Sequence, residues 1–225
     1  MEFFSHIFGF NSESPLLFTQ FYFWAFFALV YAVFALIMEV GAQSAQAIRR
    51  EGDKAKGRNT RLHLRNVFLM AVSWFFYYKT SGLFLLLLLF VTLSDWLIAR
   101  RIYEAKGERQ GSLKAKLWLA LSVIIDLGLL CYFKYAYFFT NVINNLLGTE
   151  LAVFDLFAYI GNGFSESGRF MVDSIILPVG ISFYLFQVMS YTIDVYRGHV
   201  KPVKNILDFG FYVSFFPQLV AGPIV

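Results

Sequence analysis

Residues 17–38 read LFTQFYFWAFFALVYAVFALIM, a run of 22 residues that holds no charged side chain and ends before Glu39. A helix needs about 20 mostly apolar residues to cross about 30 Å of hydrocarbon. The run therefore predicts a membrane-spanning helix, and the rest of the sequence follows the same pattern.

The composition of the whole chain supports this interpretation. Hydrophobic residues make up 58% of the 225 residues and charged residues 15%, and the mean hydropathy is +0.60. Soluble domains are about half apolar and a quarter charged. The 28 Phe and 13 Tyr are too many for a core of this size, so we expect most of them to face lipid. The sequence predicts an all-α polytopic membrane protein with a single integral membrane domain over residues 1–225.

Further apolar runs predict five more membrane segments, which makes about six in all. Residues 67–99 are too long for one crossing and are interrupted at Lys79-Thr80-Ser81-Gly82, so they form either a tight hairpin or one kinked helix. The other runs are 117–139, 174–193 and 206–225.

Charge asymmetry favours the hairpin. Three predicted loops, 41–65, 100–116 and 197–204, hold sixteen of the 19 lysines and arginines. Basic loops stay in the cytoplasm, and the first two share a side only if 67–99 crosses twice. This places the N-terminus outside, together with segment 140–173, where a short interfacial helix is expected at 151–160. The basic loops set the topology and meet anionic lipid headgroups, and nucleic acid is not an expected partner.

A polar stripe marks the segment 174–193 and its end. Gly180, Tyr184, Gln187, Tyr191 and Asp194 recur at spacings of three and four, which places them on one face of a helix. One interpretation is the polar wall of a tunnel or substrate channel. The other is a set of interhelical hydrogen bonds, which membrane bundles use widely.

The last apolar run adds two residues to the predicted tunnel lining. Pro217 breaks the hydrogen-bonding pattern beside Gln218, and irregular backbone at membrane depth is tolerated where it is buried in protein or lines a cavity. The run continues to Val225 without a polar flank, which indicates a truncated chain.

Charged residues also lie within or at the ends of the apolar runs. Asp126 and Lys134 are eight residues apart, too far for a salt bridge within one helix, so we expect each to have a partner elsewhere or, for Lys134, to reach the outer interface. Asp95 and Glu39 are expected at hydrated helix ends near the cytoplasm.

The cysteine and histidine content excludes several kinds of site. Cys131 is the single cysteine, so neither a disulfide nor a cysteine-based zinc site can form within the chain. The histidines at 6, 63 and 199 lie outside the apolar runs and have no second ligand at metal spacing. The sequence therefore predicts no metal site and no complete catalytic set.

Two long blocks resemble a known family. Residues 177–184 read LPVGISFY, the similarity continues through 186–198, and residues 215–224 read FFPQLVAGPI. These blocks closely resemble the membrane-bound O-acyltransferases, in the bacterial alginate O-acetyltransferase branch. Weaker similarity at 73–78 and 127–135 precedes these blocks. The order and spacing of all four stretches fit the family, so the resemblance covers residues 70–225.

The resemblance implies an integral membrane acyltransferase of the bacterial inner membrane. Such proteins take an acetyl group from a cytoplasmic donor, expected to be acetyl-CoA, and pass it to a hydroxyl of an extracytoplasmic polysaccharide or to a periplasmic acetylesterase-like partner. The essential histidine of the family follows the second block, so the resemblance places it beyond Val225, and no histidine here inherits that role. The resemblance therefore implies the N-terminal part of an enzyme, inactive alone.

Three alternatives remain open at this point. A transporter or flippase would use the polar stripe to bind its substrate without covalent chemistry. A non-catalytic, truncated relative would scaffold other subunits. Within the same superfamily, D-alanyl transferases share the architecture, although the FPQLVAGP wording favours acetylation of a polysaccharide.

Overall fold

The chain folds almost entirely into helices. The computed structural model describes residues 21–50, 54–108, 112–157, 159, 174–215 and 218–219, with side chains from residues 24–39 and 65–107 in the first two ranges. Within these ranges there is no β-strand. The predicted all-α class is therefore confirmed for the part of the chain that the structure describes.

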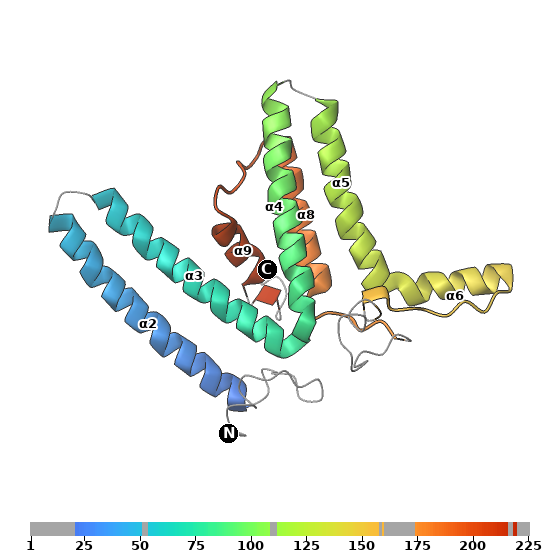
Figure 1. Cartoon of the computed structure of the whole chain (residues 1–225), viewed down its shortest axis with the longest axis horizontal. Helices are drawn as coiled ribbons and strands as arrows, with labels where there is room; N and C mark the ends of the chain where they lie inside the picture. Colours follow the sequence, from blue (N-terminus) through green and yellow to red (C-terminus); the bar gives the residue numbers. More distant parts are fainter. Residues whose placement is uncertain are drawn as a thin grey trace.

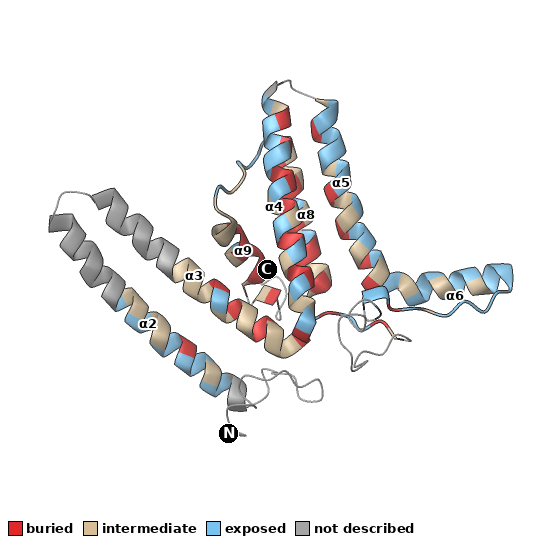
Figure 2. Ribbon diagram, in the orientation of Figure 1, coloured by how far each residue is buried: buried red, intermediate tan, exposed pale blue. Residues whose placement is uncertain are grey.

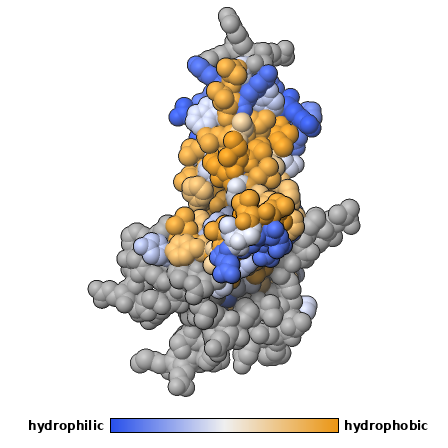
Figure 3. Space-filling view, turned by 90° about the vertical axis from the view of Figure 1, so that its right-hand side faces the viewer, coloured by the Kyte–Doolittle hydropathy of each residue, from blue (hydrophilic) through white to orange (hydrophobic). Residues whose placement is uncertain are grey.

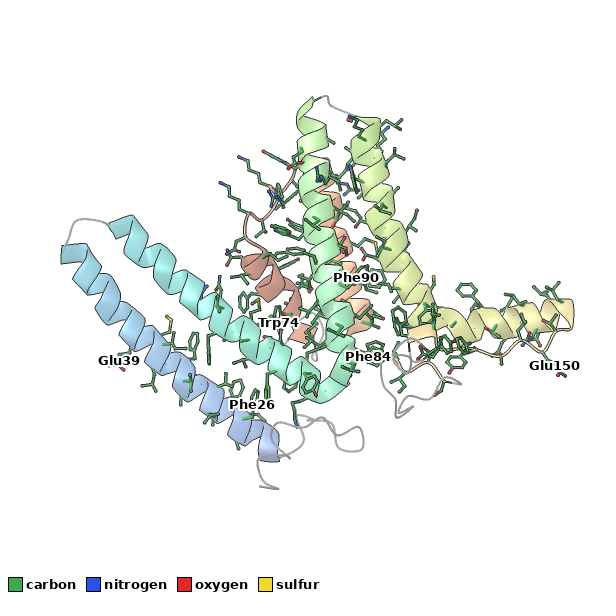
Figure 4. All side chains as sticks on the ribbon, viewed as in Figure 1. Phe26, Glu39, Trp74, Phe84, Phe90 and Glu150 are labelled. Carbon is green, nitrogen blue, oxygen red and sulfur yellow. The ribbon has the colours of Figure 1, made fainter. Side chains whose placement is uncertain are left out.

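Two long helices form an antiparallel pair at one side of the molecule (Figure 1). They are α2 (Phe21–Arg50) and α3 (Lys54–Ser81), and the ring of Phe26 lies 5.8 Å from that of Phe75 between them (Figure 4). The predicted loop at 41–65 is wrong, because both helices continue through it up to residues 51–53. The drop in hydropathy marks the place where a helix leaves the hydrocarbon, but it does not mark the end of the helix. Ala, Gln, Arg and Lys have high helix propensity, so the helix continues into water.

A sharp break separates α3 from the next helix. A 3₁₀ turn, η1 (Gly82–Phe84), joins α3 to α4 (Leu85–Glu108), and Gly82 has φ +59°, a conformation that glycine adopts without strain. The predicted interruption at 79–82 is confirmed, and the two helices diverge from it (Figure 1). Whether each of them crosses the membrane stays a prediction.

Three helices pack side by side in the densest part of the molecule (Figures 1 and 2). They are α4, α5 (Leu113–Leu130) and α8 (Ile181–Arg197). Apolar side chains fill their interface: Leu88, Val91, Ile98, Ile102, Leu185, Val188 and Val195. The predicted loop at 100–116 is wrong in the same way as the first, since α4 continues to Glu108 and α5 begins at Leu113.

The helix that follows Leu113 changes direction after Leu130. A π-helical segment, η2 (Cys131–Tyr135), leads into α6 (Ala136–Leu147), which turns away from α5 (Figure 1). The predicted segment 117–139 is helical but bends after Leu130, because π segments inside α-helices produce kinks. Whether it crosses the membrane stays a prediction.

The segment after α6 returns to η2. The buried Asp155 accepts hydrogen bonds from the Tyr132 hydroxyl (3.1 Å) and from Phe157 N (2.9 Å). The helix expected over 151–160 begins later, at Leu156, because residues 151–155 are not helical; residues 158 and 160 lie outside the described residues.

The next helix starts later than expected. The predicted run began at 174, but α8 begins at Ile181, since residues 175–178 are irregular and Gly180 adopts the left-handed conformation with φ +71°. Pro178 therefore precedes the helix and does not kink it. The helix α9 (Ile206–Ser214) is short, and the backbone leaves it at Phe215. The predicted segment 206–225 is thus interrupted, although 216–217 and 220–225 lie outside the described residues.

The outer surface of the helices is apolar. In Figure 3 hydrophobic side chains form a broad band across the face on the α5 and α6 side, with hydrophilic side chains above and below it. Exposed residues at helical spacing contribute to it on α5: Leu117, Leu121, Ile124 and Leu127. Two stretches, Arg65–Gly107 and Leu113–Leu147, are long and apolar enough to cross a membrane, and Trp24–Glu39 is a shorter apolar helix.

Candidate functional site: a buried polar seam between α4, α5 and α8

Polar side chains are buried where α4, α5 and α8 meet. Asp95 of α4 is 1% exposed, and Ser122 and Asp126 of α5 and Thr192 of α8 are fully buried. We call these four residues the polar seam. It lies within the apolar core that the three helices share.

Hydrogen bonds connect the three helices through Asp95. Its Oδ1 accepts from the Ser122 hydroxyl at 2.5 Å and from the Thr192 hydroxyl at 3.4 Å. Asp126 lies one turn after Ser122 and therefore faces the same side of α5. Its carboxyl group lies close enough to that of Asp95 for the two to interact.

Several oxygens of the polar seam have no hydrogen bond of good geometry to any described residue. They are Oδ2 of Asp95 and both carboxyl oxygens of Asp126. No described Lys, Arg or His lies within ion-pair distance of either carboxyl group. Burying a carboxylate without a partner costs a large amount of free energy, so this pair requires a physical explanation.

The seam corrects one expectation about charged residues. Asp95 was expected at a hydrated helix end, but it is buried in the middle of α4. Ser122 and Thr192 donate hydrogen bonds to it from the neighbouring helices. Glu39 is exposed in α2 and points away from α3 (Figure 4). Lys134 is also exposed, with its Nζ 5.6 Å from the centre of the Tyr135 ring.

Two tyrosines extend the polar seam toward the turn at Gly82. Tyr184 of α8 is fully buried and packs edge-on against Tyr77 of α3 with ring centroids 6.5 Å apart. Tyr77 in turn lies beside Ser81, whose hydroxyl accepts from Val179 N at 3.3 Å. Both tyrosine hydroxyls are buried without a well-formed hydrogen bond in the described structure.

The predicted tunnel residues of α8 divide between two neighbours. Tyr184 faces Tyr77, whereas Gln187 and Tyr191 face α9 and the segment before it. The Gln187 amide donates to Tyr212 O at 2.9 Å, and the Tyr191 hydroxyl accepts from Val203 N at 2.9 Å. The Tyr191 ring lies 4.7 Å from that of Phe209. These contacts are interhelical, and a tunnel along them stays a prediction.

The remaining predicted tunnel residues lie farther apart. Asp194 is at the last turn of α8, where its Oδ1 lies 3.5 Å from His199 Nδ1 and its side chain is 39% exposed. Gln218 is in a helical turn after Phe215, with its N donating to Phe215 O at 3.0 Å. Pro217 lies outside the described residues. The structure thus does not join these residues to Tyr184.

The described structure contains no histidine beside the polar seam. Of the three histidines, His199 is the one whose side chain is described, and it is 65% exposed beside Asp194. The sequence interpretation places the catalytic histidine of the family beyond Val225. Val225 itself lies outside the described residues, so nothing in the structure tests that position and it stays a prediction.

The polar seam and the tyrosines that extend it include residues that the sequence interpretation did not assign to a site: Asp95, Ser122, Thr192 and Tyr77. One signal was available, because Ser122 and Asp126 are two polar residues at i and i+4 inside an apolar run, a spacing that predicts a shared polar face. The contribution of Asp95 depends on a contact across 27 residues of sequence.

Comparisons with known proteins identify relatives of the chain. The probable alginate O-acetylase AlgI of Azotobacter vinelandii is 40% identical over 161 residues, which is 72% of this chain and 29% of that protein. The probable alginate O-acetylase AlgI of Pseudomonas aeruginosa is 38% identical over 161 residues, 72% of the chain and 28% of the relative.

A more distant relative widens the comparison. The peptidoglycan O-acetyltransferase of Helicobacter pylori is 27% identical over 183 residues, 71% of the chain and 30% of that protein. The matched residues span less than a third of the length of these relatives. No family model and no solved structure matches the chain. This membrane protein belongs to the membrane-bound O-acyltransferase family, in the branch of the alginate O-acetylases.

Proposed function

We propose that the protein is a membrane O-acetyltransferase that esterifies hydroxyl groups of a polysaccharide. The observation that carries this proposal is the 38–40% identity, over 72% of the chain, to proteins described as alginate O-acetylases. The more distant relative is described as acting on peptidoglycan, which also has a carbohydrate backbone. A hydroxyl of a sugar polymer is the acceptor chemistry that these descriptions share.

The proposal places the donor and the acceptor on opposite sides of the bacterial inner membrane. The ends of α4 and α5 that meet near Glu108 and Leu113 carry exposed basic residues: Arg100, Arg101, Lys114 and Lys116. Basic helix ends favour the cytoplasm, where acetyl-CoA would be the donor. The opposite end, at η1 and η2, then faces the acceptor, which is the polysaccharide itself or a periplasmic acetylesterase-like partner. The chain crosses the membrane several times in this arrangement, with its N-terminus outside.

In this function the helices described here hold the acyl group away from water. The acyl carbon must reach the acceptor oxygen, and positioning the two groups contributes a large part of the rate. The side of α8 that carries Tyr184, Gln187 and Tyr191 is the candidate wall for this path. Support comes from its polar side chains in an otherwise apolar helix. The base that activates the acceptor hydroxyl would be the histidine that the family resemblance places beyond Val225.

Deletion of the gene tests this function directly. The experiment measures ester-bound acetate per sugar residue, released by mild base from the polysaccharides of the organism that carries the gene, and the total polysaccharide exported. We expect ester-bound acetate to be lost and to return on complementation with the full-length gene. Unchanged acetate per sugar with reduced export would contradict the proposal and favour a transporter.

A further inference from the structure

The two carboxyl groups of the polar seam are held in an arrangement that ionised aspartates do not tolerate. Asp95 and Asp126 are 1% and 0% exposed, interact with each other, and have no described cation within ion-pair distance. Two negative charges in one dry site repel each other, and each also loses its hydration. A proton held between them removes both costs.

A second observation places buried hydroxyl groups between the pair and one end of the bundle. Tyr184 is fully buried, its hydroxyl has no well-formed hydrogen bond in the described structure, and its ring packs against that of Tyr77 with centroids 6.5 Å apart. Along α8, Tyr184 lies eight residues before Thr192, about 12 Å nearer to the turn at Gly82. Tyr77 and then Ser81 continue the row of hydroxyl groups to that turn.

The opposite side of the pair is closed. Between Asp95 and the basic helix ends the core consists of apolar side chains, all at most 5% exposed: Ile98, Ala99, Ile102, Ala115 and Val195. None of these side chains can carry a proton. The tyrosine row is therefore the candidate route for proton exchange.

We propose that Asp95 and Asp126 form a proton-holding carboxyl pair that takes up and returns a proton through Tyr184, Tyr77 and Ser81 during acyl transfer. This inference rests on the proposed function. Buried ionisable residues in membrane helices recur as proton relays, which is the chemistry that this row of groups fits.

The proton balance of acyl transfer gives the pair its task. As the acceptor oxygen bonds to the acyl carbon, its hydroxyl proton must leave, and as the carbon–sulfur bond breaks, the thiolate of the donor must gain a proton. The two events lie on opposite sides of the membrane in the proposed function. The hydroxyl proton passes from the base along the tyrosine row to the pair, and the pair returns it along the same row to water on the acceptor side. The thiolate takes its proton from water on the donor side, so the protein is unchanged after each turnover.

The first experiment tests the proton itself and needs no enzymatic activity. Infrared spectra of the full-length protein in lipid at neutral pH are recorded in H2O and D2O, for the wild type and for D95N, D126N and E104Q. We expect a carbonyl band of a protonated carboxylic acid that shifts in D2O and is lost in D95N and D126N. E104Q is the matched control, because Glu104 is an exposed carboxylate of the same helix, 3.7 Å from Arg101. Absence of the band overturns the proposal, and thermal unfolding that depends on Na⁺ would then assign the pair to a bound cation.

The second experiment tests the role of the proton in acetylation. Asparagine keeps the shape of aspartate but cannot release a proton, so D126N should lower ester-bound acetate by roughly 100-fold, within the range of proton-transfer catalysis. Y77F keeps the buried ring and removes only the hydroxyl, so it replaces D126N as the test variant if D126N protein does not accumulate. We expect Y77F to lower ester-bound acetate by about tenfold or more. E104Q should acetylate as the wild type does.

The outcomes separate this inference from the proposed function. If the wild type shows the band but produces no ester-bound acetate, the proposed function fails and the relay fails with it, while the shared proton stands. If D126N and Y77F accumulate and acetylate normally in an active background, the pair only joins the helices, and the relay is overturned.

Discussion

The hydroxyl of Ser122 donates to Oδ1 of Asp95 at 2.5 Å and so joins α5 to α4 inside the apolar core. Removal of this donor leaves a buried carboxyl oxygen with only the 3.4 Å contact from Thr192. We expect S122A to lower the free energy of unfolding by about 1–2 kcal/mol. Thermal unfolding in detergent, followed by circular dichroism, measures the change.

S94A is the matched control for this prediction. The Ser94 hydroxyl donates to Val91 O of its own helix at 3.0 Å, and this bond joins no second helix. Its removal should change the unfolding temperature much less than S122A does. Equal effects of the two substitutions on the unfolding temperature would show that the hydrogen bond between the helices stabilises the protein no more than one within a single helix.

Gly180 is predicted to tolerate no side chain. Its φ of +71° is unfavourable for other residues, and a Cβ there would collide with the carbonyl oxygen of Leu219. We expect G180A to lower stability by about 2 kcal/mol or more, since the conformation alone costs about 1–2 kcal/mol. The comparison is with G128A in α5, where a Cβ meets no atom within 4 Å.

G128A should be neutral or stabilising by up to about 1 kcal/mol, because alanine favours helices over glycine. Thermal unfolding of G180A and G128A in the same detergent measures both changes in stability. A stable G180A protein would show that α8 can begin without the close approach of Leu219.

Gln187 distinguishes a tunnel wall from a structural hydrogen bond. Its amide donates to Tyr212 O, while its Oε1 is buried without a well-formed hydrogen bond in the described residues. If this acceptor faces the acyl path, Q187L should reduce ester-bound acetate by roughly tenfold, the effect of about 1.4 kcal/mol in the transition state. S190A, at an exposed position of the same helix, should have no effect. Normal acetylation by Q187L at normal expression would leave Gln187 with its structural role alone.

Tyr132 is predicted to hold the segment after α6 in place. Its hydroxyl donates to Asp155 and accepts from Leu156 N at 2.8 Å. Y132F removes both bonds, so we expect the amide of Leu156 to exchange hydrogen faster, by roughly tenfold or more, with little change in α5. Hydrogen exchange with mass spectrometry measures this. Y135F, at an exposed tyrosine of the same π segment, is the control, and equal exchange in both variants would contradict the prediction.

Much of the helical pattern could be predicted from the sequence, because apolar runs of membrane length leave few alternatives. The run 17–38 overlaps α2, and Lys79-Thr80-Ser81-Gly82 marks the end of α3 within a few residues. Helix length could not be predicted in the same way. Residues 41–50 and 100–108 are too polar to extend a membrane span but remain helical, since most of them favour helices even where hydropathy is low.

The candidate site was harder to predict, because its contacts join distant parts of the sequence. The spacing of Tyr184, Gln187 and Tyr191 indicated a common face of a helix, but not that Tyr184 faces Tyr77 while the other two face α9. The prediction that Asp95 lies at a hydrated helix end was wrong. Its environment depends on Ser122 and Thr192, which no local pattern around residue 95 reveals.

The π segment Cys131–Tyr135 has a consequence for the evolution of the fold. A π turn holds one residue more than an α turn, so it is equivalent to a single-residue insertion in an ordinary helix. Deletion of one codon there would restore an α-helix and rotate every later side chain of that helix by about 100°. The direction of α6, and the face that it presents, thus depend on the length of the gene at one position.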